Sequence, residues 1–136
     1  MKRSARGPSV VRHGRARAVL MVAGLAFATC GIAGEADVVN AKVRRATPGV
    51  YDFDVTVRSV DRGWDYYADA IEVLAPDGRL LGRRELLHPH EAEQPFRRDL
   101  PGVRVPASVK DVIVRARHKP AGYAGSALTV HLPPDR

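Results

Sequence analysis

Apolar and polar residues alternate along several short stretches of the chain, with the period of two that a half-buried β-strand requires. The clearest stretch is 50–60, VYDFDVTVRSV, in which every second residue is apolar and its neighbours are polar. The stretches 111–119 and 128–132 repeat this pattern. We expect the apolar members of one face to be buried: Tyr51, Phe53, Val55, Val57, Val112, Val114, Leu128 and Val130.

Weaker strand candidates lie at 37–45, 67–75, 80–87 and 103–105, and no helical period persists over three turns after residue 36. About seven short strands at ten-residue intervals predict an all-β fold, a single antiparallel β-sandwich of the immunoglobulin or fibronectin type. A jelly roll is the alternative. Five turn signals separate the strands, namely TPG at 47, DRG at 61, PDG at 76, LPG at 100 and PAG at 120. The aromatic residues expected to anchor the core are Tyr51, Phe53, Trp64, Tyr67 and Phe96.

The first 36 residues have the pattern of a secretory signal peptide. Six basic residues precede an uncharged run of 17 residues at 18–34, which ends in small residues. We therefore predict a signal peptide over 1–36, cleaved after Ala33 or Ala36, and a single domain over 37–136. The protein is expected to be exported to the periplasm or the cell exterior, with no membrane span after cleavage.

The strong positive charge belongs to this leader. The formal net charge of the whole chain is +7, but the residues after position 36 contain 16 basic and 14 acidic side chains. A phosphate-binding surface needs clustered basic residues, so this balance argues against nucleic acid as a partner.

Cys30 is the only cysteine and lies inside the leader. The run LAFATC loosely resembles a lipoprotein signal, in which the cysteine carries the lipid. Phe27 stands where leucine is usual, and Thr29 is larger than the usual glycine or alanine, so the sequence disfavours a lipid anchor. Without Cys30 the domain has neither a disulfide nor a thiolate metal ligand.

The segment RRELLHPHEAEQPF, residues 83 to 96, contains the most specific candidate chemistry. In an extended segment His88 and His90 project the same way, and Pro89 favours an extended conformation before it. Neutral imidazoles bind zinc or copper well. A further metal ligand would come from His118, Glu93 or Glu91, with His118 the first choice; the alternative is that the segment is a polar surface turn.

The same spacing resembles the first cupin motif, because Gly82 precedes His88 and His90 at the required interval. The resemblance implies a small cupin-like metalloenzyme. Glu93 comes one residue too early for that motif, and a second motif is absent. No other stretch of the sequence gives positive support for catalysis.

The segment DRGWDYYAD, residues 61 to 69, offers a second candidate. Trp64 and Tyr66 could form a stacking platform for a ligand, although we favour the interpretation in which these aromatics pack into the core.

Together, the blocks GWDYYAD, LLHPHEAEQPF and VRARHKPAGYAG resemble a family of short exported bacterial proteins of unknown function. The resemblance implies an exported single domain and brings no ligand with it. The sequence therefore predicts a binding or accessory module with a protein or small-molecule partner. The alternatives are the cupin-like metalloenzyme and a purely structural or protein-interaction module.

Overall fold

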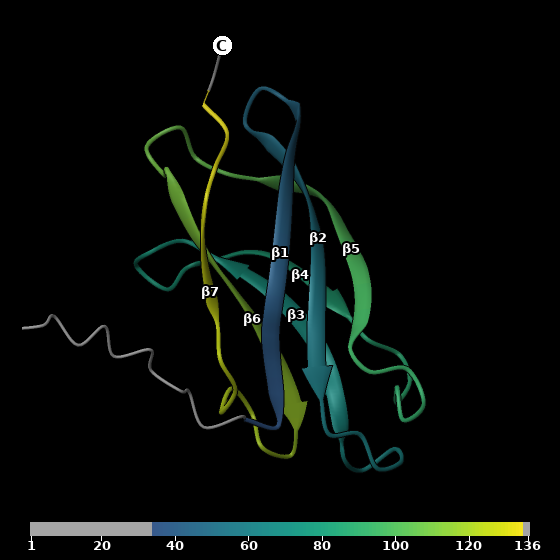
Figure 1. Ribbon diagram of the computed structural model, residues 1–136. Coiled ribbons are helices and arrows are strands. Elements are labelled where there is room, and N and C mark those ends of the chain that lie inside the picture. Colours follow the sequence, from purple (N-terminus) through teal and green to yellow (C-terminus); the bar gives the residue numbers. More distant parts are fainter. Residues whose placement is uncertain (1–33, 135–136) are drawn as a thin grey trace, which may run out of the picture.

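The computed structural model describes residues 34–134, and seven strands account for most of them (Figure 1). The leader predicted over 1–36 lies outside the described residues except for its last three positions. No helix long and apolar enough to cross a membrane occurs in the described part. The strands are β1 (Ala36–Thr47), β2 (Val50–Ser59), β3 (Tyr67–Leu74), β4 (Leu80–Glu85), β5 (Phe96–Arg104), β6 (Asp111–Lys119) and β7 (Leu128–His131).

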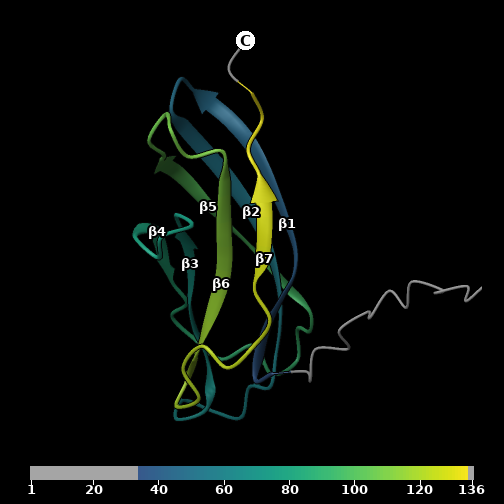
Figure 2. The ribbon, with the colours of Figure 1, turned by 90° about the vertical axis from the view of Figure 1, so that its left-hand side faces the viewer.

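These strands form two antiparallel sheets that face each other, as Figures 1 and 2 show. One sheet has the order β1-β2-β5 and the other the order β4-β3-β6-β7. These two packed antiparallel sheets confirm the predicted β-sandwich of the immunoglobulin or fibronectin type. The fold is not the jelly roll given as the alternative.

The core lies between the sheets and follows the predicted alternation. Phe53 and Phe96 are the largest fully buried side chains. Of the eight apolar residues expected inside, the six on β2 and β6 are buried, whereas Leu128 and Val130 of the short edge strand β7 are only partly buried against the core. The edge position explains the difference, because β7 has a neighbouring strand on one side only.

Four of the five predicted turn signals lie between strands, whereas LPG at 100 was wrongly expected to be a turn and lies at a bulge inside β5. All five end in a glycine with positive φ, a conformation that a side chain disfavours. These residues are Gly49, Gly63, Gly78, Gly102 and Gly122.

The outer face of β3 is also buried, which hides its period of two. Glu72 is 3% exposed and lies between arginines of the two neighbouring strands, Arg83 at 3.1 Å and Arg115 at 3.0 Å. The paired guanidinium groups compensate the buried carboxylate, and their aliphatic stems cover the strand.

Two expectations about the core and the domain start need correction. Trp64 is 64% exposed and does not anchor the core. The folded domain also begins before residue 37: Ala36 is 1% exposed, and the carbonyl of Glu35 accepts a hydrogen bond from the amide of Val60 at 2.9 Å.

Candidate functional site

Three loops meet at one end of the sandwich, and the first strand starts at the same end (Figure 1). They are the β2–β3 loop (60–66), the β4–β5 loop (86–95) and the β6–β7 loop (120–127). We call this the loop end. It contains all the residues that the sequence singled out for metal or ligand binding except His118, which lies near the end of β6.

Asp61 ties the first two of these loops together. Its side chain is fully buried and accepts hydrogen bonds from the backbone amides of His90 at 2.7 Å and Ala68 at 3.0 Å. The hydroxyl of Ser59 donates to the same carboxylate at 2.7 Å. A buried carboxylate is costly unless its oxygens are satisfied, and here backbone and side-chain donors satisfy them.

Gln94 adds a second connection between the same loops. Its side-chain oxygen accepts from the amide of Ser59 at 2.9 Å, and its amide group donates to the carbonyl of His90 at 2.8 Å. The amide of Gly63 donates to Glu91 at 2.5 Å near the loop tips. These contacts fix the position of His90, although its side chain makes none of them.

His90 and His88 lie side by side in the β4–β5 loop. Their ring centroids are 4.5 Å apart, and the ring of His90 stacks on Phe96 at 3.9 Å. The side chain of His90 is 2% exposed, and neither of its ring nitrogens forms a hydrogen bond within residues 34–134. The nearest carboxylate oxygen belongs to Asp61, 3.7 Å from Nδ1, beyond hydrogen-bond distance.

A small hollow of about 130 Å³ opens beside the two rings. It is lined by both histidines and by charged side chains of the neighbouring strands, among them Arg84 and Arg98. Burial lowers the pKa of His90, and the positive charge of Arg98 lowers it further. The neutral imidazole, which is the metal-binding form, is therefore favoured at this position.

His118 and Glu93 do not join the pair. His118 is buried at 1% exposure, one ring nitrogen donates to the carbonyl of Val60 at 2.8 Å, and its ring meets Tyr66 edge to face at 4.4 Å. Glu93 forms a bidentate ion pair with Arg98. No group of three potential ligands for a metal ion occurs in the described part of the chain.

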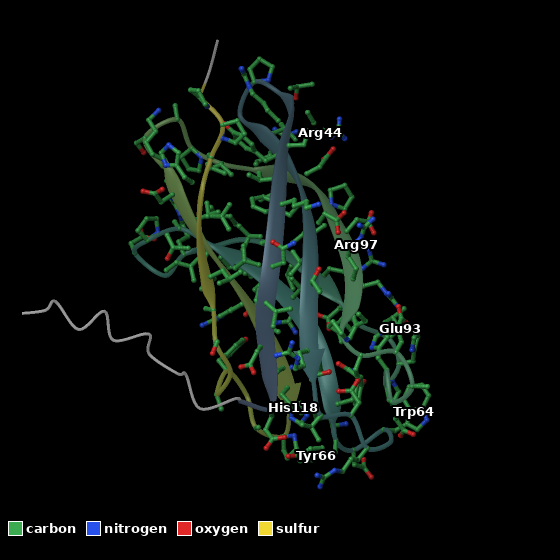
Figure 3. All side chains as sticks on the ribbon, viewed as in Figure 1. Arg44, Trp64, Tyr66, Glu93, Arg97 and His118 are labelled. Carbon is green, nitrogen blue, oxygen red and sulfur yellow. The ribbon has the colours of Figure 1, made fainter. Side chains whose placement is uncertain are left out.

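The two aromatics proposed as a stacking platform have different surroundings (Figure 3). Trp64 projects at the tip of the β2–β3 loop and contacts Tyr67 edge to face, with 6.1 Å between centroids. Tyr66 packs on His118, and the carboxylate of Glu35, hydrogen-bonded to the phenol, raises the pKa of Tyr66. The two rings therefore do not form one flat platform, and only Trp64 is strongly exposed.

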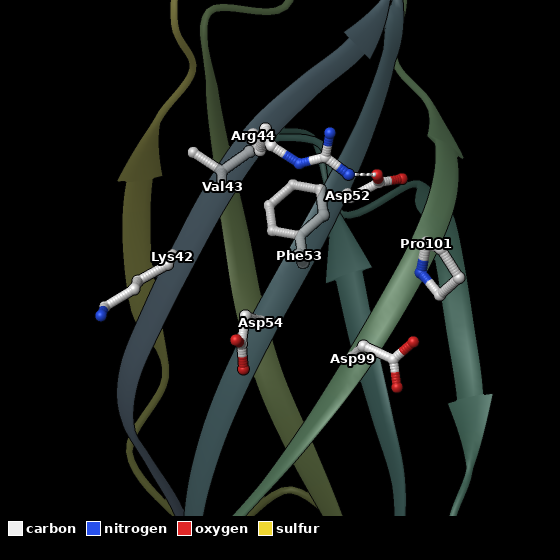
Figure 4. A pocket seen from close by; sticks show the side chains of 8 residues that line it. All are labelled: Lys42, Val43, Arg44, Asp52, Phe53, Asp54, Asp99 and Pro101. Atoms are coloured by element: carbon white, nitrogen blue, oxygen red, sulfur yellow. Dashed lines mark hydrogen bonds and ion pairs between the residues drawn. The ribbon is translucent and has the colours of Figure 1, made fainter.

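Other hollows have less specific chemistry. Figure 4 shows one of about 460 Å³ on the outer face of β1, β2 and β5. Four of its charged side chains are already paired: Arg44 with Asp52 at 2.5 Å, Asp54 with Arg97, and Asp99 with Arg84. Such a network of exposed ion pairs is typical of a solvated sheet face.

Sequence reasoning missed Asp61 and Gln94 as the residues that shape the site. Their contacts join positions 29 and 35 residues apart, which no local spacing predicts. The only signal was their occurrence in the two loops that also contain Trp64 and the histidines.

Comparison with known proteins gives one relative. A protein of Halomicrobium mukohataei described as "Putative lipoprotein" is 40% identical over 96 residues, which cover 71% of this chain and 47% of that protein. The chain thus spans about half the length of this relative. No protein-family model matches the chain, and no solved structure matches it.

Proposed function

We propose that this protein is an exported binding module of the cell envelope that takes a transition-metal ion, zinc or copper, through His88 and His90. The observation that carries the proposal is the buried ring of His90, which has two nitrogens without hydrogen-bond partners beside a second imidazole. Buried polar atoms are rarely left without partners, and a site that binds an ion is one reason for an exception.

The dimensions of the pair are compatible with a shared ion. Zinc binds imidazole nitrogen at about 2.0–2.1 Å, so the centroids of two rings on one tetrahedral ion lie about 5 Å apart. The centroids of His88 and His90 are 4.5 Å apart. Water or a group from a partner molecule would complete the coordination, because the pair supplies two ligands.

The hollow beside the histidines favours a binding module over the cupin-like metalloenzyme. Pockets that enclose a small substrate usually measure about 300–1,000 Å³. The space beside His88 and His90 is about 130 Å³. Gly82, which suggested the cupin motif, also has a structural role, since a Cβ there would lie 2.8 Å from the side chain of Val103.

Export is supported by the leader and by the relative. The basic start and the uncharged run at 18–34 are typical of secreted proteins. The description of the relative as a lipoprotein favours a cell-envelope location and gives weight to a lipid on Cys30. The resemblance to a family of short exported bacterial proteins points to the same location.

Titration calorimetry with zinc and with copper at neutral pH tests the metal proposal. The double variant His88→Ala/His90→Ala should lose binding, because it removes both imidazoles. His131→Ala is the matched control, since His131 is exposed at the opposite end and pairs with Asp111 at 2.8 Å. Equal binding by the wild type and the double variant would show that the segment is a polar turn.

A further inference from the structure

We propose that the loop end rests on the membrane surface, with Trp64 and Leu87 in the interface between lipid and water. This inference builds on the proposed envelope location. It concerns the state in which the segment preceding Gly34 is held in the membrane, and it does not depend on metal binding.

Exposed apolar side chains concentrate at the loop end. Leu87 is 78% exposed in the β4–β5 loop, and Trp64 is 64% exposed in the β2–β3 loop. Tyr123 of the β6–β7 loop and Val60 are exposed at 43% and 38%. Four of the six large apolar residues that are exposed in the described part therefore belong to these three loops.

The chain enters the domain at this same end. The backbone of Gly34 packs against that of Gly125 in the β6–β7 loop, so closely that a Cβ on Gly34 would lie 2.3 Å from the Cα of Gly125. Glu35 is hydrogen-bonded through its carbonyl to Val60, one of the exposed residues. The entry point and the apolar loops are thus neighbours.

No polar spacer separates the uncharged run from the fold. The run at 18–34 ends at Gly34, and Glu35 is the first charged residue after Arg17. An extended chain advances at most about 3.3–3.6 Å per residue. If a lipid on Cys30 or the run itself anchors the chain, Gly34 stays within about 14 Å of the anchor, so the loop end is held next to the bilayer.

The charges of the loop end favour an apolar contact over an electrostatic one. The three loops expose one cation, Arg62, against three anions, Asp65, Glu91 and Glu93. Without net positive charge the loops gain nothing from anionic lipid headgroups. Tryptophan, in contrast, prefers the bilayer interface, because its ring is apolar and its N–H remains hydrogen-bonded.

Two side chains give a weak contact alone, but the anchor makes it effective. Stable attachment of a protein to a membrane usually needs two signals, and tethering raises the effective concentration of the second. The leader or lipid supplies the first signal, and Trp64 with Leu87 supplies the second. The competing hypothesis is that Trp64 and Leu87 bind a protein partner. In that case Trp64 stays in water when only lipid is present.

Trp64 is the sole tryptophan, so its fluorescence reports directly on the contact. The full chain, residues 1–136, is reconstituted in phosphatidylcholine vesicles with and without brominated acyl chains. We expect the emission to shift to shorter wavelength, the brominated lipid to quench it, and 1 M salt to leave the quenching unchanged.

Two leucine-to-aspartate variants test whether the membrane contact is confined to the loop end. Leu87→Asp should remove most of the quenching, whereas Leu80→Asp should retain it, because Leu80 is 49% exposed but starts β4 at the opposite end. Trp64 emission that is neither shifted nor quenched in the anchored wild type would overturn the proposal, as would equal effects of the two variants. Export is read separately, from the location of the protein in cells, so a failure of docking is distinct from a failure of the envelope assignment.

Discussion

Replacing Asp61 with alanine should destabilise the domain more than any other single change in its loops. The variant removes the acceptor of the His90 and Ala68 amides, two backbone donors that are satisfied at 2.7 and 3.0 Å. A buried donor left without an acceptor costs about 1–3 kcal/mol, so the expected loss in free energy of unfolding is about 2–6 kcal/mol. Ser59 contributes less, because its hydroxyl hydrogen can rotate away from the lost acceptor, which a backbone amide cannot do.

Asp61→Asn separates charge from shape. The amide keeps one acceptor oxygen, but its NH₂ group must face one of the donors, so the loss should be about 1–3 kcal/mol. Asp65→Ala is the matched control in the same loop. Asp65 is exposed, and such substitutions usually change stability by less than about 0.5 kcal/mol.

Urea denaturation at pH 7, followed by circular dichroism, gives the three free energies. Amide hydrogen exchange adds a local measurement, because Asp61→Ala should release the protection of the His90 amide while amides in the centre of β2 remain protected. A loss below about 1 kcal/mol in Asp61→Ala, with the His90 amide still protected, would refute the role assigned to this carboxylate.

Three further expectations concern the core, pH and processing. Phe53→Ala should cost about 3–5 kcal/mol in urea unfolding because Phe53 is 1% exposed, and a loss under 1 kcal/mol would contradict its place in the core. Burial lowers the pKa of His90 in the folded state. At a pH between this lower pKa and that of the unfolded chain, the unfolded chain therefore binds a proton at His90 that the folded chain does not. Stability should therefore fall by up to about 1.4 kcal/mol per pH unit as the pH drops from roughly 6.5 toward the lower folded pKa, and His90→Phe should remove this component; an unchanged slope would count against the assignment. Intact mass spectrometry of the exported protein should show an N-terminus at Gly34 or a lipidated Cys30, and a chain starting at Asp37 would contradict the observed packing of the first strand.

The sequence predicted best the strands whose two faces differ most in solvent exposure. Alternation marked β2 and β6 because one face is buried and the other is wet. β5 was expected only at 103–105 but begins at Phe96. The sequence pattern missed its first part because a bulge, between the residues that pair with Tyr51 and Phe53 of β2, interrupts the alternation. β3 was only a weak candidate because paired arginines bury its outer face as well.

The site was predictable only where its residues are adjacent in sequence. The pair His88 and His90 follows from a spacing of two, and the structure brings the rings together. His118 was expected to converge on them, yet its nitrogen is used inside the fold by the carbonyl of Val60. Trp64 was expected inside because aromatics usually fill small cores, but its loop extends beyond the sheets.

The metal proposal requires that both imidazoles, those of His88 and His90, bind the ion. Nitrogen-15 NMR of the imidazole rings during a zinc titration follows each histidine separately. We expect the ring-nitrogen signals of His88 and His90 to shift together at one equivalent of zinc, while those of His118 and His131 stay in place. Shifts confined to His131, or no shift at His90, would contradict it.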